Sequence, residues 1–320
     1  MRFLLGKLMQ AGGVLLVVSF LTFALLAAAP GNFLSEARLD PRISASTLQE
    51  LNARYGLDRP LVSRYAAWLR AVSHGDLGLS FAYATPVSTL LLPRIRNTLI
   101  LTVSAAVVSW AIAVLLGVWV AANENGALDR SLSAVSSALI AVPDVLWVTA
   151  LLLFAVRSRL LPAGGMISID FADRSIGGKV GDLASHGLLP LTAIVLSTLP
   201  GLLRHVRASM AEVLHSDFIT AGAARGVPRW RILYRHALRP AANPLISLAG
   251  LSFGRLLSTS LVVEVVLSWP GIGPLLVEAI LARDVLLVMA AVNISTALTV
   301  AGSFLADLAL RLSDPRIASS

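Results

Sequence analysis

The length of its uncharged apolar runs is what most constrains this chain. The run from Leu8 to Ala29 contains no Asp, Glu, Lys or Arg, and neither does the run from Thr98 to Ala122. An α-helix rises about 1.5 Å per residue, so about 20 apolar residues cross a hydrocarbon core roughly 30 Å thick. Because both runs reach that length, the sequence predicts helices that span a membrane.

Six such helices are predicted, so the expected fold is all-α and polytopic, a single transmembrane domain over residues 1–320. The first run resembles a cleaved signal peptide, but it exceeds the usual apolar region of about 7–15 residues. We therefore expect an uncleaved first helix. The expected spans are residues 8–29, 98–122, 132–156, 187–210, 245–267 and 285–310.

Composition excludes the other broad classes. Apolar residues make up 56% of the 320 residues and charged residues 14%, with a mean hydropathy of +0.79. A soluble domain averages about 25% charged residues, so neither a soluble globule nor a disordered chain fits. Cysteine is absent, which excludes disulfides, a thiolate nucleophile and a Cys-ligated zinc site.

The net charge of +8 marks orientation rather than nucleic-acid binding. Arginines concentrate between two apolar runs, as the positive-inside rule predicts for a cytoplasmic loop. With six spans, both termini lie on the same side as this loop, residues 211–243, while the segments 30–93 and 157–186 lie outside. The clustered arginines are Arg204, Arg207, Arg225, Arg229, Arg231, Arg235 and Arg239.

The outer segment 30–93 carries its own helix signals. Ser46 and Gln49 form a capping-box pattern, and Gly56 can end that helix. A second helix follows until Gly75, with an apolar stripe that either lies on the membrane surface or packs on the protein itself. The stripe consists of Leu61, Tyr65, Trp68, Leu69 and Val72.

An enzyme would need residues that this chain lacks. Its histidines include no HExxH pair, which excludes a zinc protease of that type. Neither Lys7 nor Lys179 fits a serine–lysine dyad, and Val180 follows Gly178-Lys179 where a phosphate-binding P-loop needs Ser or Thr. We expect no catalytic residue, no metal and no cofactor here, so ATP-driven work must come from a partner.

Between the fourth and fifth spans lies a loop with an unusual pattern. A short helix of small residues begins at Asp217, Gly226 to Pro228 breaks it, and an amphipathic helix continues to Pro240. Small residues let another surface approach the backbone closely. Arg231, Arg235 and Arg239 form a basic stripe that contacts lipid headgroups, solvent or a partner protein.

This loop resembles the EAA loop of ABC importer permeases, in which Glu-Ala-Ala is followed after three residues by Gly. Thr220, Ala221 and Gly222 lie at the three named positions and Gly226 at the final glycine. Thr replaces the Glu, so a salt bridge from that Glu to an ATPase does not carry over.

Three further stretches are similar to the first permease subunit of the dipeptide, oligopeptide and nickel branch of that family. They cover nearly the whole chain in the correct order. The stretches are Tyr55 to Leu61 with His74 to Val87, then Val263 to Gly273 running on to Asp284, and the tail Asp314 to Arg316.

The resemblance implies a type I ABC importer permease in a bacterial or archaeal cell membrane. Its implied partners are a second homologous permease, two cytoplasmic ATPases that bind Mg-ATP, and an extracytoplasmic binding protein that delivers small peptides, nickel complexes or related solutes. The loop would couple the ATPases to the pore through Asp217, Phe218, Ile219, Thr220, Ala221, Gly222, Arg225, Gly226, Arg229 and Trp230. Docking candidates are Phe218, Ile219, Arg225, Arg229 and Trp230.

Two charges lie near the middle of predicted spans. Asp144 follows Pro143 in the third span, and Arg255 lies in the fifth. One charge at this depth costs roughly 2.5–3.5 kcal/mol on insertion scales. We expect the two to form an ion pair, as a structural clamp or as a contact for a charged group of the cargo. Glu264, near a span end, is expected at the water interface.

The alternative is a secondary transporter that works alone on an ion gradient. It predicts a relay of intramembrane carboxylates and broken helices in related halves. The only carboxylates in the predicted spans are Asp144, Glu264 and Asp307, and the sequence shows no internal repeat. The importer is therefore the favoured interpretation.

Overall fold

The computed structural model describes residues 2–29 and 60–313, and these residues are mostly α-helical. In those residues no β-strand forms, and the only β pairing is an isolated bridge between Leu79 and Pro86. The predicted all-α fold is confirmed. The capping pattern at Ser46, the motif at 55–59 and the tail Asp314 to Arg316 lie outside the described residues.

Five described helices are long and apolar enough to cross a membrane, and a bent pair of helices supplies a sixth. This confirms a polytopic protein. The stretches are Leu5–Ala28 within α1 (Arg2–Ala28), α5 (Val87–Ala121), α8 (Ile176–Leu214), Arg229–Val266 with α11 (Leu238–Val266), and Val285–Leu312 within α13 (Val285–Ser313).

The third predicted span is not one continuous helix. The structure divides it into α6 (Ala127–Ala141) and α7 (Asp144–Ser158), which are bent by 97°. Pro143 lacks an N–H and disfavours helical backbone in the residue before it. Val142 is accordingly extended, with φ −91° and ψ 126°. The expectation of an unbroken helix over 132–156 is corrected by this proline.

The fourth span begins earlier than the apolar run indicates. Helix α8 starts at Ile176, where the Ser175 hydroxyl accepts a hydrogen bond from the Gly178 N–H. It continues through Pro190 and Pro200 to Leu214. Part of the segment predicted as an outer loop, residues 157–186, is therefore helical.

The chain forms two compact units, and the first comprises Met1–Arg96 and Gly271–Leu298. In it, α4 (Leu61–Ser73) packs on α1. The Tyr65 hydroxyl lies 2.8 Å from that of Ser19, and the Tyr65 ring meets the edge of Phe20. The apolar stripe of α4 therefore packs against the protein's own helices, around Phe23, Trp68 and Met289.

Two sequence stretches far apart in the chain meet in this first unit. The Ser80 hydroxyl donates to Oδ2 of buried Asp284 at 2.6 Å, and the Ala82 N–H donates to the same oxygen at 3.1 Å. Asp284 also accepts from the Leu287 N–H at the start of α13. Nearby lies α12 (Ile272–Leu281), a short apolar helix that the sequence patterns did not predict.

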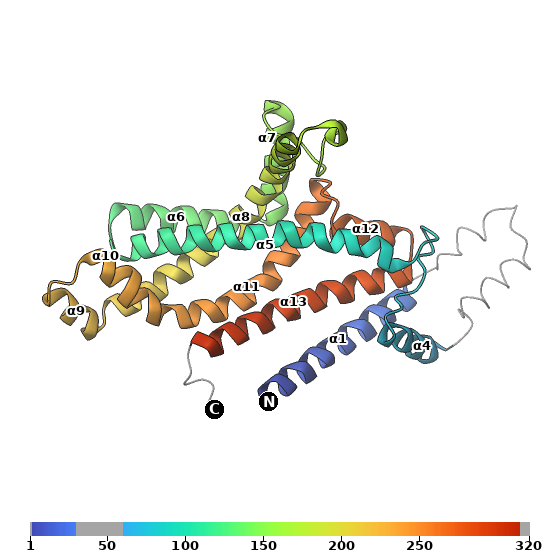
Figure 1. Ribbon diagram of the computed structural model, residues 1–320, viewed down its shortest axis with the longest axis horizontal. Helices are drawn as coiled ribbons and strands as arrows, with labels where there is room; N and C mark the ends of the chain where they lie inside the picture. The colour runs from blue at the N-terminus through green and yellow to red at the C-terminus, as the bar shows by residue number, and fades with distance from the viewer. Residues whose placement is uncertain (1, 30–59, 314–320) are drawn as a thin grey trace, which may run out of the picture. The chain divides into compact units, whose positions relative to one another are not determined.

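The second unit comprises Asn97–Pro270 and Thr299–Ser320 and holds two apolar cores. In it, α8 packs against α6, α7 and α11 (Figure 1). One core joins α5, α7, α8 and α11 around Ile194 and Leu256. The other joins α5 and α8, around Val206, to the loop between α8 and α11.

Close helix contacts in this second unit depend on glycine. A Cβ on Gly117 of α5 would lie 2.6 Å from Val206 Cγ1 of α8. A Cβ on Gly250 of α11 would lie 2.6 Å from Ala306 Cβ of α13. Since real Cβ atoms do not approach this closely, only glycine permits these helices to pack at their present separation.

Candidate coupling site

The coupling loop, residues 211–243, folds as a short helix, a break and a second helix, as its sequence predicts. The first is α9 (Asp217–Ala224), and the second is α10 (Arg229–Arg231) leading through η2 (Ile232–Ala237) into α11. Figure 1 shows α9 and α10 beyond the adjoining ends of α5 and α6.

The break depends on Gly226 and Pro228. Gly226 has φ +77°, a left-handed conformation that only glycine adopts at little cost. The next N–H, of Val227, donates back to the Gly222 carbonyl and closes the end of α9. Pro228 precedes the first residue of α10, where the following helix needs no N–H from it.

The turn η2 is π-helical, so its hydrogen bonds span one residue more than those of an α-helix. Ile232 and Ala237 are both buried, five residues apart. Between them, Tyr234, Arg235 and His236 are consecutive exposed residues. The regular i, i+4, i+8 basic stripe expected from the sequence is therefore interrupted by a wider turn.

One face of the coupling loop packs on helices of the same chain. Ile219 is 7% exposed and lies in the core that Val118 of α5 and Val206 of α8 also enter. Ile232 is 8% exposed in the same core. The expectation that Ile219 docks on a partner is corrected, because its side chain anchors α9 internally.

The opposite face of the loop is open. Phe218 is 53% exposed and Trp230 is 61% exposed, and the Arg231 guanidinium lies 5.4 Å from the centre of the Trp230 ring. The other exposed residues predicted for this site are Asp217, Thr220, Ala221, Arg225, Gly226 and Arg229, whereas Gly222 is partly buried.

Arg229 has a different contact from the one the sequence predicted. Its Nη2 donates to the Ala122 carbonyl and, at 3.3 Å, to Asn123 Oδ1. Both acceptors belong to the turn between α5 and α6, residues 122–126. Arg229 therefore holds the coupling loop to the α5–α6 turn of its own chain.

A second polar group near this turn has no sequence signature. Asp129, in the first turn of α6, is 3% exposed and accepts hydrogen bonds from Arg207 Nε at 2.5 Å and Nη2 at 2.7 Å. The Asn125 N–H donates to it at 2.9 Å. Because the two residues are 78 apart in the chain, no local spacing could have revealed this pair.

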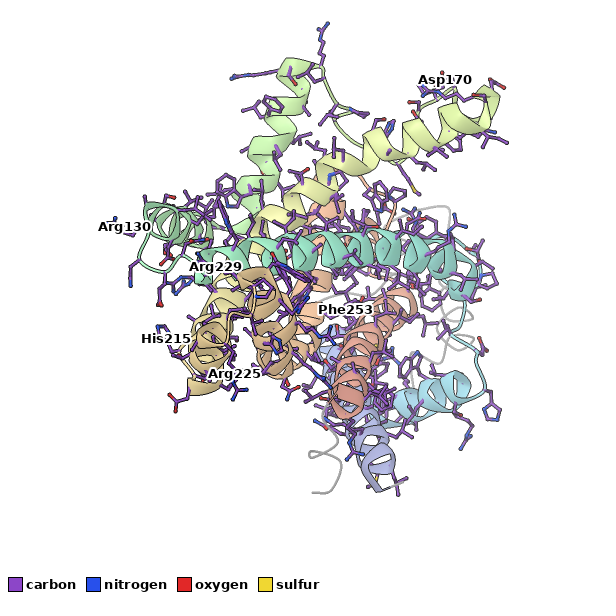
Figure 2. The ribbon with its side chains drawn as sticks, turned by 60° about the vertical axis from the view of Figure 1, so that its left-hand side comes forward. Arg130, Asp170, His215, Arg225, Arg229 and Phe253 are labelled. Atoms are coloured by element: carbon purple, nitrogen blue, oxygen red, sulfur yellow. The ribbon has the colours of Figure 1, made fainter. Side chains whose placement is uncertain are left out.

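A cavity of about 610 Å³ lies between the turn and the coupling loop. Glu124 and His215 line its rim, with Glu124 Oε2 3.3 Å from His215 Nε2. Figure 2 shows His215 and Arg229 at one end of the second unit and Asp170 well away from them. Polar side-chain contacts therefore lie at the rim of a cavity that separates part of the turn from the coupling loop.

The two mid-span charges are not ion-paired in the described residues. Asp144 is partly buried at the start of α7 and accepts a hydrogen bond from Thr259 at 3.0 Å, whereas Arg255 is exposed one turn before Thr259 on α11. Because a helix N-terminus favours a negative charge, the start of α7 stabilises the Asp144 carboxylate without Arg255. The direct ion pair is therefore corrected.

Glu264 also differs from expectation. Its side chain is fully buried and accepts a hydrogen bond from Ser260 at 3.0 Å, one helical turn earlier on α11. The prediction of a water-exposed interfacial residue is wrong, because neighbouring helices cover this part of α11.

The segment between α7 and α8 is held by its own ion pairs. Ser168 donates to buried Asp182 from both its N–H and its hydroxyl, and Arg174 lies 2.9 Å from the same carboxylate. Arg174 also hydrogen-bonds Asp170, which lowers the pKa of the Asp170 carboxyl. These contacts fix a segment that the sequence leaves as loop.

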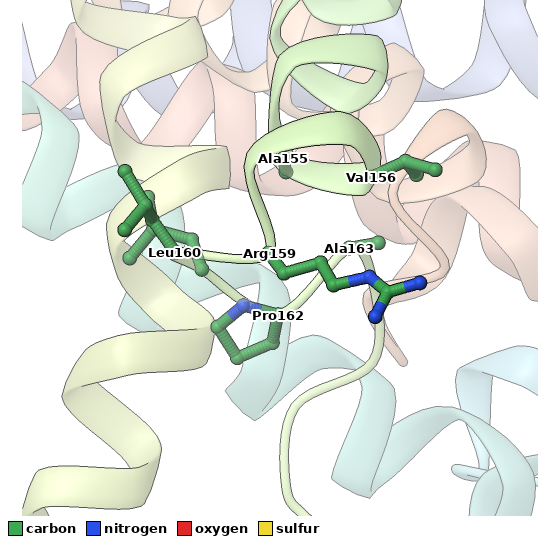
Figure 3. Close-up of a pocket in the computed structure, with 7 residues that line it drawn as sticks. Ala155, Val156, Arg159, Leu160, Pro162 and Ala163 are labelled. Atoms are coloured by element: carbon green, nitrogen blue, oxygen red, sulfur yellow. The ribbon is translucent and has the colours of Figure 1, made fainter.

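A shallow hollow of about 500 Å³ lies at the end of α7, where its chain turns toward this segment (Figure 3). Arg159, in a left-handed conformation with φ +55°, is its one charged lining residue. In the described residues no cluster of three metal-ligating side chains occurs here or elsewhere.

Comparison with known proteins shows which family contains this chain. The family described as "Binding-protein-dependent transport system inner membrane component" matches residues 113–319, which include the whole coupling loop. The chain belongs to this family. The family described as "Binding-prot-dependent transport system membrane comp, N-term" matches residues 1–102. The protein is therefore a multi-pass inner membrane permease of an ABC importer, not an enzyme, and it works with ATPase and binding-protein partners.

Similar proteins cover the chain from end to end. Oligopeptide transport system permease protein AppB of Bacillus subtilis is 30% identical over 98% of each chain. Dipeptide transport system permease protein DppB of Escherichia coli K12 is 31% identical over 99% of this chain and 98% of its own. Oligopeptide transport system permease protein OppB of Haemophilus influenzae is 32% identical over 99% of each.

Proposed function

We propose that this permease imports small peptides as one half of a transmembrane pore. A second homologous permease forms the other half, two cytoplasmic ATPases supply the energy, and an extracytoplasmic binding protein delivers the peptide. The similarity to three peptide permeases over nearly the whole chain supports the cargo class. The basic coupling loop supports an orientation with both termini in the cytoplasm.

The observation that carries this proposal is the two-sided coupling loop. Its inner face is anchored by Ile219 and Ile232, while Phe218 and Trp230 extend from its outer face. Exposed aromatic side chains beside arginines are typical of protein contacts with high binding energy. An ATPase that closes on ATP shifts the pore only if it contacts a part of the permease that moves with it.

Purification of the tagged permease with its neighbouring subunits tests the docking role. Phe218→Ala and Trp230→Ala are expected to lower the amount of ATPase that co-purifies, each by roughly tenfold or more, since interface aromatics often contribute 2 kcal/mol. Leu160→Ala serves as the control, because Leu160 is 75% exposed just after α7, outside the loop. Equal ATPase recovery from all three variants would overturn the docking assignment.

The mid-span charges extend the proposal to the peptide. Exposed positions on α11 form a helical stripe that includes Ser247, Arg255 and Ser258. A charged side chain at this depth avoids lipid and faces a polar route or another subunit. We place Arg255 on the translocation route, where it contacts the carboxylate of the passing peptide, with Asp144 close by for the ammonium group.

Uptake of modified peptides tests this placement. Arg255→Gln is expected to slow uptake of a peptide with a free carboxyl terminus more than uptake of the same peptide as its amide. Asp144→Asn is expected to slow uptake of a peptide with a free amino terminus more than uptake of the same peptide with that terminus capped. Ser258→Ala lies on the same stripe and controls for the substitution itself. Loss of uptake that is identical for free and capped peptides contradicts the assignment.

A further inference from the structure

The coupling loop is joined to the rest of the second unit at more than one place. Its apolar core contact with α5 and α8 is one. The others are polar and converge on the turn between α5 and α6. We define the turn clamp as five charged or titratable side chains at this turn. Arg229 and His215 belong to the coupling loop, Glu124 belongs to the turn, and Asp129 and Arg207 join α6 to α8 beside it.

Arg229 forms the direct bridge from the loop. Its guanidinium binds the carbonyl of Ala122, the first residue after α5, and the side chain of Asn123. A backbone carbonyl does not rotate away as a side chain does, so this contact fixes α10 to the end of α5. A carbonyl at a helix C-terminus also lacks an intrahelical partner and is a favourable acceptor for arginine.

His215 and Arg207 form the bridge from α8. His215 Nδ1 donates to the Ala211 carbonyl at 2.7 Å, so its Nε2, 3.3 Å from Glu124 Oε2, donates to that carboxylate only when the imidazole carries both protons. Arg207 binds Asp129 through two nitrogens and lies 4.0 Å from Glu124. Asp129 in turn accepts the Asn125 N–H, so α6, the turn and α8 are connected through one carboxylate.

The turn between α5 and α6 is closed by a hydrogen bond of its own. Asn125 has φ +60°, and the Gly126 N–H donates to the Asn123 carbonyl. Under the bridges lies the cavity of about 610 Å³. Its lining includes Ile219 and Ile232 of the apolar core, so the loop is joined to α5 both by this core and by the polar bridges at the rim of the cavity.

We propose that the turn clamp is the element that transmits movement of the coupling loop to α5 and α6, as positioning residues for transport. This rests on the proposed function, in which the ATPases move the loop. A clamp that is intact keeps the loop, the turn and the start of α6 together through the ATP cycle. When it is broken, the loop moves with the ATPase and the turn does not follow.

The test uses the complete transporter reconstituted in liposomes, with both permeases, the ATPases and the binding protein. Arg229→Gln is expected to lower peptide taken up per ATP hydrolysed by roughly 3- to 10-fold, within the range for residues that modulate coupling. ATPase co-purification and ATP hydrolysis remain near wild type. Arg229→Lys, which keeps a donor, restores part of the ratio.

Arg130→Gln is the matched control, because Arg130 is an exposed arginine next to Asp129 on α6, and no contact of its side chain is found in the described residues (Figure 2). It is expected to leave uptake per ATP unchanged. An unchanged ratio in Arg229→Gln, or an equal loss in Arg130→Gln, overturns the clamp. Failure of the wild-type complex to take up peptide with ATP instead overturns the proposed function.

A distance measurement shows whether a lower uptake ratio comes from lost transmission of movement between the coupling loop and α6 or only from a less stable protein. Since the chain has no cysteine, spin labels can be placed at Ala127→Cys and Ala224→Cys, which are exposed on α6 and α9. In wild type the distance between the labels should stay the same with and without ATP. In Arg229→Gln it should change with ATP, and a constant distance in that variant contradicts the proposal.

Discussion

Ser80 and Asp284 are 204 residues apart in the chain, yet their side-chain oxygens lie 2.6 Å apart. The contact joins the segment before α5 to the start of α13 within the first unit. Two stretches that the family resemblance singled out separately are thus parts of one buried hydrogen-bonded group.

Asp284→Ala is expected to destabilise the permease by about 1–3 kcal/mol, the cost of leaving buried donors without an acceptor. Ser80, Ala82 and Leu287 would lose their shared partner. Thermal unfolding of the purified permease in detergent measures the effect. Asp173→Asn, at an exposed position, should leave the midpoint unchanged, and an equal shift in both variants would rule out the explanation.

The Arg207–Asp129 pair should show strong coupling in a double-mutant cycle. Asp129 is 3% exposed, so removing Arg207 leaves the Asp129 carboxylate with poor access to water. The coupling free energy between Asp129→Asn and Arg207→Gln is expected at about 1–3 kcal/mol, the upper part of the range for contacting residues. The same cycle with Arg204→Gln, an exposed arginine on α8, should give a value near zero.

Gly250→Ala should weaken the packing of α11 against α13. The added Cβ would lie 2.6 Å from Ala306 Cβ, which cannot move without its helix. Overpacking of this kind costs about 1–3 kcal/mol. Gly201→Ala is the control, since a Cβ there meets nothing within 4 Å. Unfolding midpoints should fall for the first variant and stay level or rise for the second, because alanine favours helix.

Tyr83 should ionise at higher pH than an ordinary tyrosine. Its hydroxyl donates to Glu278 at 2.5 Å, and this hydrogen bond raises the pKa of Tyr83 above 10.0. The stabilisation is complete below the unfolded pKa and is lost as pH rises through the folded one. The absorbance difference between wild type and Tyr83→Phe, followed during alkaline titration, should have its midpoint above 10.0. A midpoint at or below that value contradicts the contact.

Local patterns predicted the presence of long apolar helices and the helix–break–helix form of residues 217–239. Uncharged runs located the membrane helices because length and apolarity alone decide whether a helix can cross lipid. Gly226 and Pro228 located the loop break because each restricts the backbone by itself. The bend at Pro143 had the same kind of local signal, but the apolar residues on both sides made one span the simpler prediction.

What the sequence did not reveal depends on long-range contacts. The burial of Glu264 and the pairing of Asp129 with Arg207 follow from which helices pack together. Likewise, Asp144 and Arg255 were expected to pair because both are charged at similar depth, whereas Thr259 supplies the hydrogen bond to Asp144. Opposite charge identifies candidate partners, but only the packing of α7 on α11 selects among them.

The extra residue in η2 sets the rotational phase of the fifth membrane helix. Each residue of an α-helix advances the chain by about 100° around its axis. Deleting Tyr234 would convert the π-turn into an ordinary helix and turn α11 by that angle relative to α9, or force the loop to unwind. The wide turn therefore sets a fixed rotation angle between α9, which we propose contacts the ATPase, and α11, which carries Arg255.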